Sequence, residues 1–291
     1  MPTHFQIVLI SLLEKLYRTH VLSVVRFSRH TNALRAVISG RLPKKDLRSD
    51  EMYRVYDLCL GCKGCKRECP SGLDVAKMKI EFLAHYNSAR GIPVRAKMFG
   101  YIHELSRIAS QARFLANFAT GSQIPCWVLA QLGIYPNRSL PRFAPETFTD
   151  WFYKHQSVNH KTPNGKVVYF HDTWVTFYYP EVGKAAVKLL ESAGFDAILA
   201  PQRVCCGPPM LSKGMVEPAR SRARRNAALL APYASQGIAI IGTEPSCILT
   251  FPDEYQGLLP GNADAKIVAE NTFLLEEFLL KLQKDGKLNI S

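Results

Sequence analysis

The sequence lacks the short motifs that bind common redox and energy cofactors. It has no Gly-x-Gly-x-x-Gly turn after a predicted strand and no Walker loop, so the chain carries no recognisable nicotinamide, flavin or ATP site of its own. It also has no serine-centred nucleophile elbow. These absences predict a chain with no complete active site of its own.

Long apolar runs are absent as well. The best one, FQIVLISLL, ends at Glu14 and Lys15 and falls far short of the about 18 residues of a membrane-spanning helix. A basic start and a small-residue cleavage site are missing, so the run is a poor signal peptide. The eight cysteines are clustered rather than spread through a short chain, which favours a reduced compartment and a metal or redox role. We therefore expect a cytoplasmic protein, docked peripherally at the inner face of a membrane.

Acidic residues are scarce relative to basic ones. The 37 Lys and Arg outnumber the 24 Asp and Glu, which gives a formal net charge of +13. Such a balance favours anionic partners, although scattered charges also serve solubility alone. The densest run, Arg220 to Arg225, lies inside a helical pattern and is interpreted as a solvated face, so no nucleic-acid partner is expected.

The 291 residues suggest one large or two ordinary domains, and the pattern changes along the chain. We expect a basic helical segment over 1–42, a helical domain over 43–118, a linker rich in proline and aromatic residues over 119–164, and an α/β domain over 165–291. In the last part, the strand-like runs KVVYFHD, DAILAPQ and IAIIGTEP alternate with helical patterns, and NTFLLEEFLLKLQKDG is predicted to be a closing helix. Alternating strands and helices predict a parallel sheet.

Four cysteines stand close together in CLGCKGCKRECP. The spacing Cys59-x2-Cys62-x2-Cys65-x3-Cys69-Pro matches the run with which bacterial-type ferredoxins bind a 4Fe–4S cluster. Two-residue gaps let the backbone wrap one face of a cubane, and we expect Gly61 and Gly64 to take positive φ values there. The neighbouring Lys63, Lys66 and Arg67 would raise the reduction potential of an anionic cluster, and Pro70 prevents a helix from continuing.

The spacing does not decide which residue is the fourth ligand of the cluster. In two-cluster ferredoxins the fourth cysteine of such a run serves the other cluster, and here no cysteine precedes Cys59. Either Cys69 closes its own cluster or another thiol such as Cys126 substitutes, although Cys126 also suits a buried apolar position. Zinc usually takes two well-separated cysteine pairs, so a basic zinc-stabilised nucleic-acid-binding protein is the weaker interpretation.

A second group of cysteines follows the predicted strands. Cys205 and Cys206 come after the second strand and Cys247 after the third, so all three should meet at the carboxyl edge of the sheet. We expect a second metal or thiol redox site there, the alternative being that the thiols are inert. His171-Asp172 looks like an acid/base pair but is interpreted as a strand end.

The runs NALRAVISGRL, DLCLGCKGCKRECPSGLDVAKMKIEFL, YPEVGKAAVKLLESAGF, CCGPPMLSKG, ARRNAALLAPYA and EPSCILTFPDEY, taken together, resemble the C-terminal iron–sulfur part of FAD-linked oxidases. D-lactate and D-2-hydroxyglutarate dehydrogenases are such proteins. More distant are the glycolate oxidase iron–sulfur subunit, the C subunit of anaerobic glycerol-3-phosphate dehydrogenase and the B subunit of heterodisulfide reductase. The resemblance covers about residues 30–285. It implies an α+β protein of several parts, in which an all-α helical ferredoxin domain precedes an α/β parallel-sheet CCG domain.

The chain departs from the pattern of that family in several places. The family has a flavin domain and a first cluster motif before the matched region, and a second CCG repeat after the one repeat present here. Asp172 and Glu244 stand where cysteine-rich relatives have cysteines. Cys205, Cys206 and Cys247 would therefore be half of a shared site.

The resemblance implies an iron–sulfur electron-transfer module of a flavin-dependent 2-hydroxyacid oxidoreductase. It would relay electrons from FAD on a partner flavoprotein, or on a missing domain, to a quinone or another carrier. A second CCG repeat from another chain and a contact with a membrane surface or quinone are the other implied partners. The alternative is a truncated fragment of a fused dehydrogenase without independent activity.

Overall fold

A computed structural model describes residues 48–291 except 71, 122–130, 132–139, 156–163 and 289–291. The predicted segment 1–42, much of the predicted linker and Cys126 lie outside the described residues. The chain divides into two compact units, Met1–Ile92 with Ser212–Met215 and Pro93–Leu211 with Val216–Ser291, here called unit 1 and unit 2. The domain boundaries expected from the sequence remain predictions.

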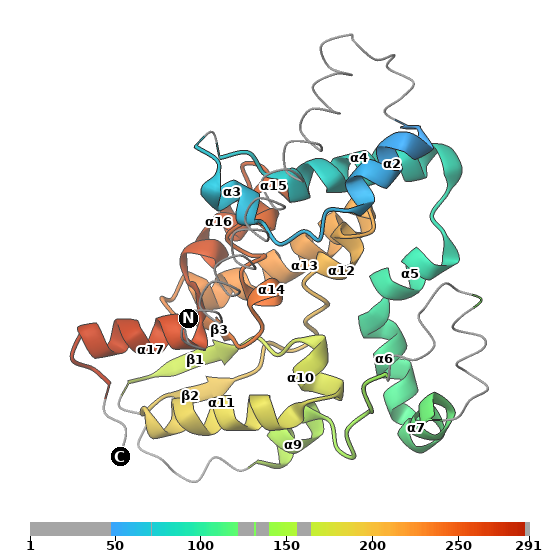
Figure 1. The fold of residues 1–291 in the computed structure, drawn as a ribbon. Coiled ribbons are helices and arrows are strands. Elements are labelled where there is room, and N and C mark those ends of the chain that lie inside the picture. Colours follow the sequence, from blue (N-terminus) through green and yellow to red (C-terminus); the bar gives the residue numbers. More distant parts are fainter. Residues whose placement is uncertain (1–47, 71, 122–130, 132–139, 156–163, 289–291) are drawn as a thin grey trace, which may run out of the picture. The chain divides into compact units, whose positions relative to one another are not determined.

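Unit 1 is helical over its described residues, with α2 (Asp50–Asp57), α3 (Gly64–Glu68) and α4 (Val75–Arg90) (Figure 1). The α4 helix confirms the apolar periodicity of LDVAKMKIEFLAHY, and Asp74 caps it by accepting the backbone N–H of Lys77 at 3.0 Å. The core of the unit joins α2 to α4, because Tyr56 stacks on Phe82 with ring centroids 4.9 Å apart.

The segment Ser212–Met215 packs closely on α4. Gly214 has φ +69° and approaches the backbone of Leu83 so closely that an added Cβ would lie 2.6 Å from it. The side-chain amide of Asn87 donates to the carbonyl of Lys213 at 2.8 Å. Only glycine satisfies both the backbone conformation and the close approach.

Unit 2 is built on a four-stranded sheet with the order β2-β1-β3-β4, in which every pairing is parallel. The strands are β1 (Lys166–Tyr169), β2 (Asp196–Ile198), β3 (Ile240–Gly242) and β4 (Thr272–Leu274). The helices described in this unit are α5 (Val94–Gly100), α6 (Ile102–Gln111), α7 (Arg113–Gly121), α9 (Phe148–Lys154), α10 (Thr173–Phe177), α11 (Pro180–Ser192), α12 (Pro208–Leu211), α13 (Val216–Ala234), α14 (Pro245–Ile248), α15 (Glu254–Leu258), α16 (Ala263–Glu270) and α17 (Leu275–Lys284).

Both faces of the sheet are covered. Val167, Tyr169 and Ile241 pack with residues of α9, α11 and α17 in one buried cluster. Val168 and Ile240, which alternate with them along the strands, are also fully buried. The chain crosses from β1 to β2 in one direction and from β2 to β3 in the other, so right-handed crossovers place α11 and α13 on opposite faces (Figure 1).

The expected parallel sheet is confirmed, and one element differs from the prediction. The stretch NTFLLEEFLLKLQKDG is not helical throughout, because Thr272–Leu274 forms β4 beside β3 and α17 begins at Leu275. Thr272–Leu274 pairs in parallel with Ile240–Gly242 of β3, and aromatic Phe273 suits a strand. Among the helices of the described residues, none is both long enough and apolar enough to cross a bilayer.

Candidate functional site

The cysteine run forms a loop of unit 1 that connects α2 to α4. Gly61 and Lys63 take left-handed conformations, with φ +71° and +58°. The prediction for Gly64 was wrong: this residue opens α3, and the left-handed turn that precedes the helix falls on Lys63 instead. The loop therefore makes two sharp turns within its first five residues.

Two donors hold this loop from α4. The backbone N–H of Val75 donates to the Sγ of Cys65 at 3.3 Å, and the Lys79 ammonium donates to the carbonyl of Cys59 at 2.7 Å. Cys59 and Cys65 pack against the core of unit 1, whereas Cys62 is exposed.

The donor chemistry of the run fits an iron–sulfur cluster, since all four side chains are soft thiol ligands on a loop shaped by left-handed residues. The thiols are not preassembled: within the described part of the chain, no three His, Cys, Asp or Glu side chains are placed to hold a metal ion together.

In unit 2, the structure brings Cys205, Cys206 and Cys247 together. The Cys206 thiol is hydrogen-bonded to the thiols of both Cys205 and Cys247. Cys205 and Cys206 lie on the loop after β2, and Cys247 lies in α14 after β3, so all three are at the carboxyl edge of the sheet, as the sequence predicted. This is also the side on which the order of crossovers reverses between β1 and β3, which is where open α/β sheets place their sites.

The three thiols differ in acidity. A hydrogen bond from Cys206, the backbone N–H of Gly207 and the guanidiniums of Arg222 and Arg203 together lower the pKa of Cys205 to about 7 against the effect of burial. The pKa of Cys206 is raised well above its ordinary value by its hydrogen bonds to the other two thiols and by burial. The three thiols thus include one that ionises near neutral pH and one that stays protonated, an arrangement suited to thiol redox chemistry.

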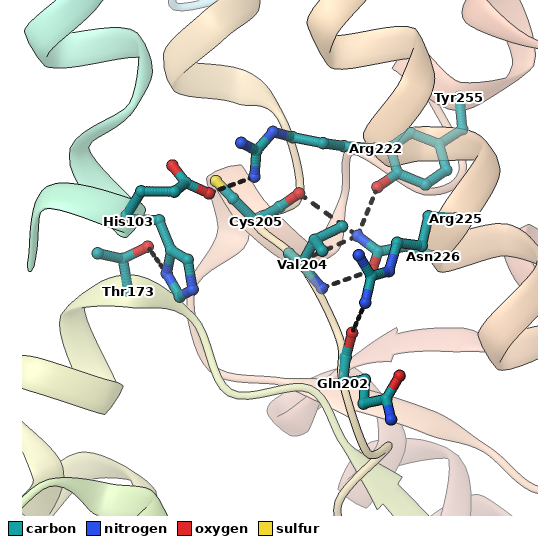
Figure 2. Close-up of polar contacts among 10 residues, drawn as sticks. His103, Thr173, Gln202, Val204, Cys205, Arg222, Arg225, Asn226 and Tyr255 are labelled. Carbon is teal, nitrogen blue, oxygen red and sulfur yellow. Dashed lines mark hydrogen bonds and ion pairs between the residues drawn. The ribbon is translucent and has the colours of Figure 1, made fainter. Parts of the chain in front are cut away.

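The loop that carries Cys205 and Cys206 is held by the buried side-chain amide of Asn226. Asn226 of α13 accepts the backbone N–H of Val204 at 3.1 Å and donates to the carbonyls of Val204 and Cys205 at 3.1 and 3.4 Å (Figure 2). Tyr255 of α15 accepts from Asn226 at 3.1 Å and donates to the carbonyl of Cys206 at 3.0 Å. Both side chains are fully buried.

A buried guanidinium lies beside the thiols. Arg203 donates to Thr176 at 3.0 Å, contacts the ring nitrogens of His171 and lies over the ring of Phe170 at 5.5 Å. Burial, and then the charge of Arg203, hold the pKa of His171 well below its ordinary value, so this imidazole is neutral. The pair His171-Asp172 is therefore part of a packed strand end, as interpreted from the sequence, and His171 supports Arg203.

Asp172 and Glu244, which stand at the ends of β1 and β3, both cap helices. One carboxylate oxygen of Asp172 accepts the N–H groups of Trp174 and Val175 at the start of α10, and Glu244 accepts the N–H of Ser246 at the start of α14. The other oxygen of Asp172 is buried and has no hydrogen-bond partner among the described residues. Burial raises the pKa of Asp172, and the charge of Glu244 adds to this effect.

Sequence reasoning missed Arg203, Asn226 and Tyr255. Arg203 is two residues from Cys205, and this proximity was an available signal. Asn226 and Tyr255 act across 21 and 49 residues of chain, so nothing in the local sequence marks them. Their roles follow from the tertiary packing of α13 and α15.

The segment that carries this site is similar to known proteins. Residues 167–252, which include β1 to β3 and all three thiols of unit 2, match the family described as Cysteine-rich domain, CCG. The chain is 29% identical over 159 residues to the C subunit of anaerobic glycerol-3-phosphate dehydrogenase from Escherichia coli (strain K12), a match covering 54% of this chain and 39% of that one. No solved structure is significantly similar.

Two other relatives match more of this chain. D-2-hydroxyglutarate dehydrogenase of Haemophilus influenzae is 26% identical over 219 residues, covering 72% of this chain and 21% of that protein. The probable glycolate oxidase iron-sulfur subunit of Bacillus subtilis is 23% identical over 240 residues, covering 78% and 52%. The chain thus spans only between about a fifth and a half of the length of these relatives. The resemblance predicted from the sequence is confirmed: residues 167–252 match the CCG cysteine-rich domain family, and the similar proteins include relatives named in that prediction.

Proposed function

We propose that this chain is an iron–sulfur electron-transfer component of a flavin-dependent dehydrogenase that acts on a 2-hydroxyacid or a related alcohol. The observation that carries the proposal is the loop from Cys59 to Cys69, whose four thiols have ferredoxin spacing and whose backbone is fixed by α4. The relatives support it, because two of them are named as iron–sulfur subunits or dehydrogenase subunits and a third as a dehydrogenase.

In this proposal Cys59, Cys62, Cys65 and Cys69 hold a 4Fe–4S cluster in a helical ferredoxin-type domain. A bound cluster would supply one-electron transfer without bond chemistry. The residues around the loop set how readily an electron is accepted: the N–H donated to Cys65 and the Lys79 ammonium both stabilise added negative charge. The lysines and the arginine within the run act in the same direction.

The chain would work with a flavoprotein subunit or domain that oxidises the substrate, and would pass electrons to a quinone or another carrier. Cys205, Cys206 and Cys247 would form a second metal or redox site, completed by a second CCG repeat from a partner. Only the thiols of this chain are counted in that site, because Asp172 and Glu244 serve as helix caps. The cytoplasmic, membrane-peripheral location expected from the sequence belongs to the same proposal.

The test is the iron and acid-labile sulfide content of the full chain after anaerobic purification, compared with three single variants. Cys62→Ser should lose most of the iron, because it removes a ligand without touching the packed core. Cys126→Ser is the matched control and should retain it, whereas Cys69→Ser should not. Zinc in place of iron, or iron that survives in Cys62→Ser, would overturn the proposal, and loss of iron in Cys126→Ser but not in Cys69→Ser would overturn the ligand assignment.

A further inference from the structure

Unit 2 contains a cavity that none of the roles above uses. Its volume is about 430 Å³, within the range of small-molecule sites. It lies between α6, the loop after β2 and α13, and Figure 2 shows three of its lining residues, His103, Arg222 and Arg225. The lining residues are Tyr101, His103, Glu104, Arg107, Arg203, Val204, Pro218, Ser221, Arg222 and Arg225.

The charge of this cavity is unbalanced. Four of its ten lining residues are arginines and one is a glutamate. The glutamate is already engaged, because Glu104 forms an ion pair with Arg222 at 2.5 Å. Arg225 donates to the carbonyl of Gln202 at 3.2 Å, and Arg203 contacts the neutral side chains described above. An excess of three positive charges therefore faces the cavity without a carboxylate partner in its lining.

The side chain of His103 lies close to three of these guanidiniums. Its imidazole lies against Thr173, with Nδ1 3.0 Å from the hydroxyl oxygen. Burial, followed by the charges of Arg203, Arg222 and Arg107, lowers the pKa of His103 to about 3. Three cations from α6, the loop after β2 and α13 thus act on one side chain, and the imidazole that they surround adds no charge of its own.

Like charges gathered around a hollow repel one another, and water screens them only in part. A planar guanidinium fork matches the oxygens of a carboxylate or phosphate, and such charge-assisted pairs are strong. The lining also offers the Ser221 hydroxyl and the rings of Tyr101 and His103. We propose that this cavity binds a small oxyanion, a metabolite carrying carboxylate or phosphate groups, through Arg107, Arg203, Arg222 and Arg225.

This inference is independent of the proposed electron transfer, because none of the seven cysteines that the structure describes lines the cavity. Its failure would leave the iron–sulfur proposal standing, and the converse also holds. Arg107 and Arg225 are the informative positions, since both are exposed at the rim and neither forms a salt bridge within the described residues. Arg224, an exposed neighbour on α13 that does not line the cavity, is the matched control.

The experiment is isothermal titration calorimetry of the full chain with inorganic phosphate and, separately, with succinate, at constant ionic strength. We expect one saturable site with a Kd below about 1 mM for at least one probe. Arg107→Gln and Arg225→Gln should each weaken that binding about tenfold or more, since each removes a charge-assisted contact. Arg224→Gln should change it less than about twofold, because distant surface charges are screened.

The two probes separate the two chemistries: tighter phosphate binding indicates a phosphorylated ligand, and tighter succinate binding a carboxylic acid. Far-UV circular dichroism of each variant verifies that it is folded. The proposal is refuted if neither probe binds saturably up to about 10 mM, which is far weaker than an arginine-lined cavity should give. An effect of Arg224→Gln as large as that of Arg225→Gln would also refute it, since binding would then reflect general surface charge.

Discussion

Replacing Asn226 by alanine tests how the loop that carries Cys205 and Cys206, here called the CCG loop, is held in place. This side chain is fully buried and makes four hydrogen bonds, three to the backbone of Val204 and Cys205 and one to the hydroxyl of Tyr255. Alanine removes all four at once. The Val204 N–H and the carbonyls would then stay buried with fewer partners, because the Tyr255 hydroxyl already donates to Cys206.

The expected loss of stability follows from these bonds. At about 1 kcal/mol net for each of the three shorter bonds, with less for the 3.4 Å contact, the unfolding free energy of unit 2 should fall by about 3–4 kcal/mol. Tyr255→Phe keeps the ring and loses two of the contacts, so it should cost about 1–2 kcal/mol. Asn271→Ala, which loses a single bond to the carbonyl of Ile267, should cost about 1 kcal/mol or less.

The assay is urea unfolding followed by tryptophan fluorescence. The chain has no tryptophan before residue 127 and none in Ser212–Met215, so this signal reports on unit 2 rather than unit 1. The order Asn226→Ala, then Tyr255→Phe, then Asn271→Ala should appear in the midpoints at similar slopes. A cost below about 1 kcal/mol for Asn226→Ala would refute the assignment of this amide as the anchor of the CCG loop.

Three further changes test other parts of the structure. Gly183→Ala should destabilise unit 2 by about 1–3 kcal/mol in urea, although alanine favours helices, because the new methyl group would lie 2.6 Å from the ring of Phe148; a stabilised variant would contradict this packing. Gly214→Ala should lower the thermal midpoint of unit 1 measured by circular dichroism, because φ is +69° there and Leu83 leaves no room, and an unchanged midpoint would argue against that contact. The pKa of His103 is lowered to about 3, so below about pH 6.5 the unfolded chain binds a proton that the folded chain does not bind. The unfolding free energy should therefore decrease as the pH is lowered, by about 2 kcal/mol at pH 5. In His103→Gln this part of the pH slope should disappear, and a slope identical to that of the unmodified chain would count against the buried neutral imidazole.

The alternation of β1, β2 and β3 with helices was predictable, because each of these strands lies in a short apolar run between turn residues. Pro180 opens α11, and Gly194, with φ +82°, follows its end; these residue types are typical of those two positions. The β4 strand was not predictable, since three residues next to a strong helical pattern carry little signal, and β3 supplies the pairing that decides between the two. Tertiary context overrides local propensity there.

In the candidate site, too, some residues were predictable from the sequence and others were not. Spacing alone brought out the cysteine run, and topology alone brought Cys205, Cys206 and Cys247 to one edge of the sheet. The supports of these thiols could not be predicted, because Asn226 and Tyr255 reach the CCG loop from helices far along the chain. The cationic cavity was hidden for the same reason, since its arginines come from three separate segments.

Electron paramagnetic resonance of the anaerobically purified, dithionite-reduced chain tests the central claim most directly. A reduced cubane cluster held by the loop from Cys59 to Cys69 predicts a signal of one unpaired electron, with about four iron and four sulfide per chain. The same signal should be absent from Cys62→Ser. A reduced protein without any such signal and without iron would contradict the account, because the run would then hold no electron carrier.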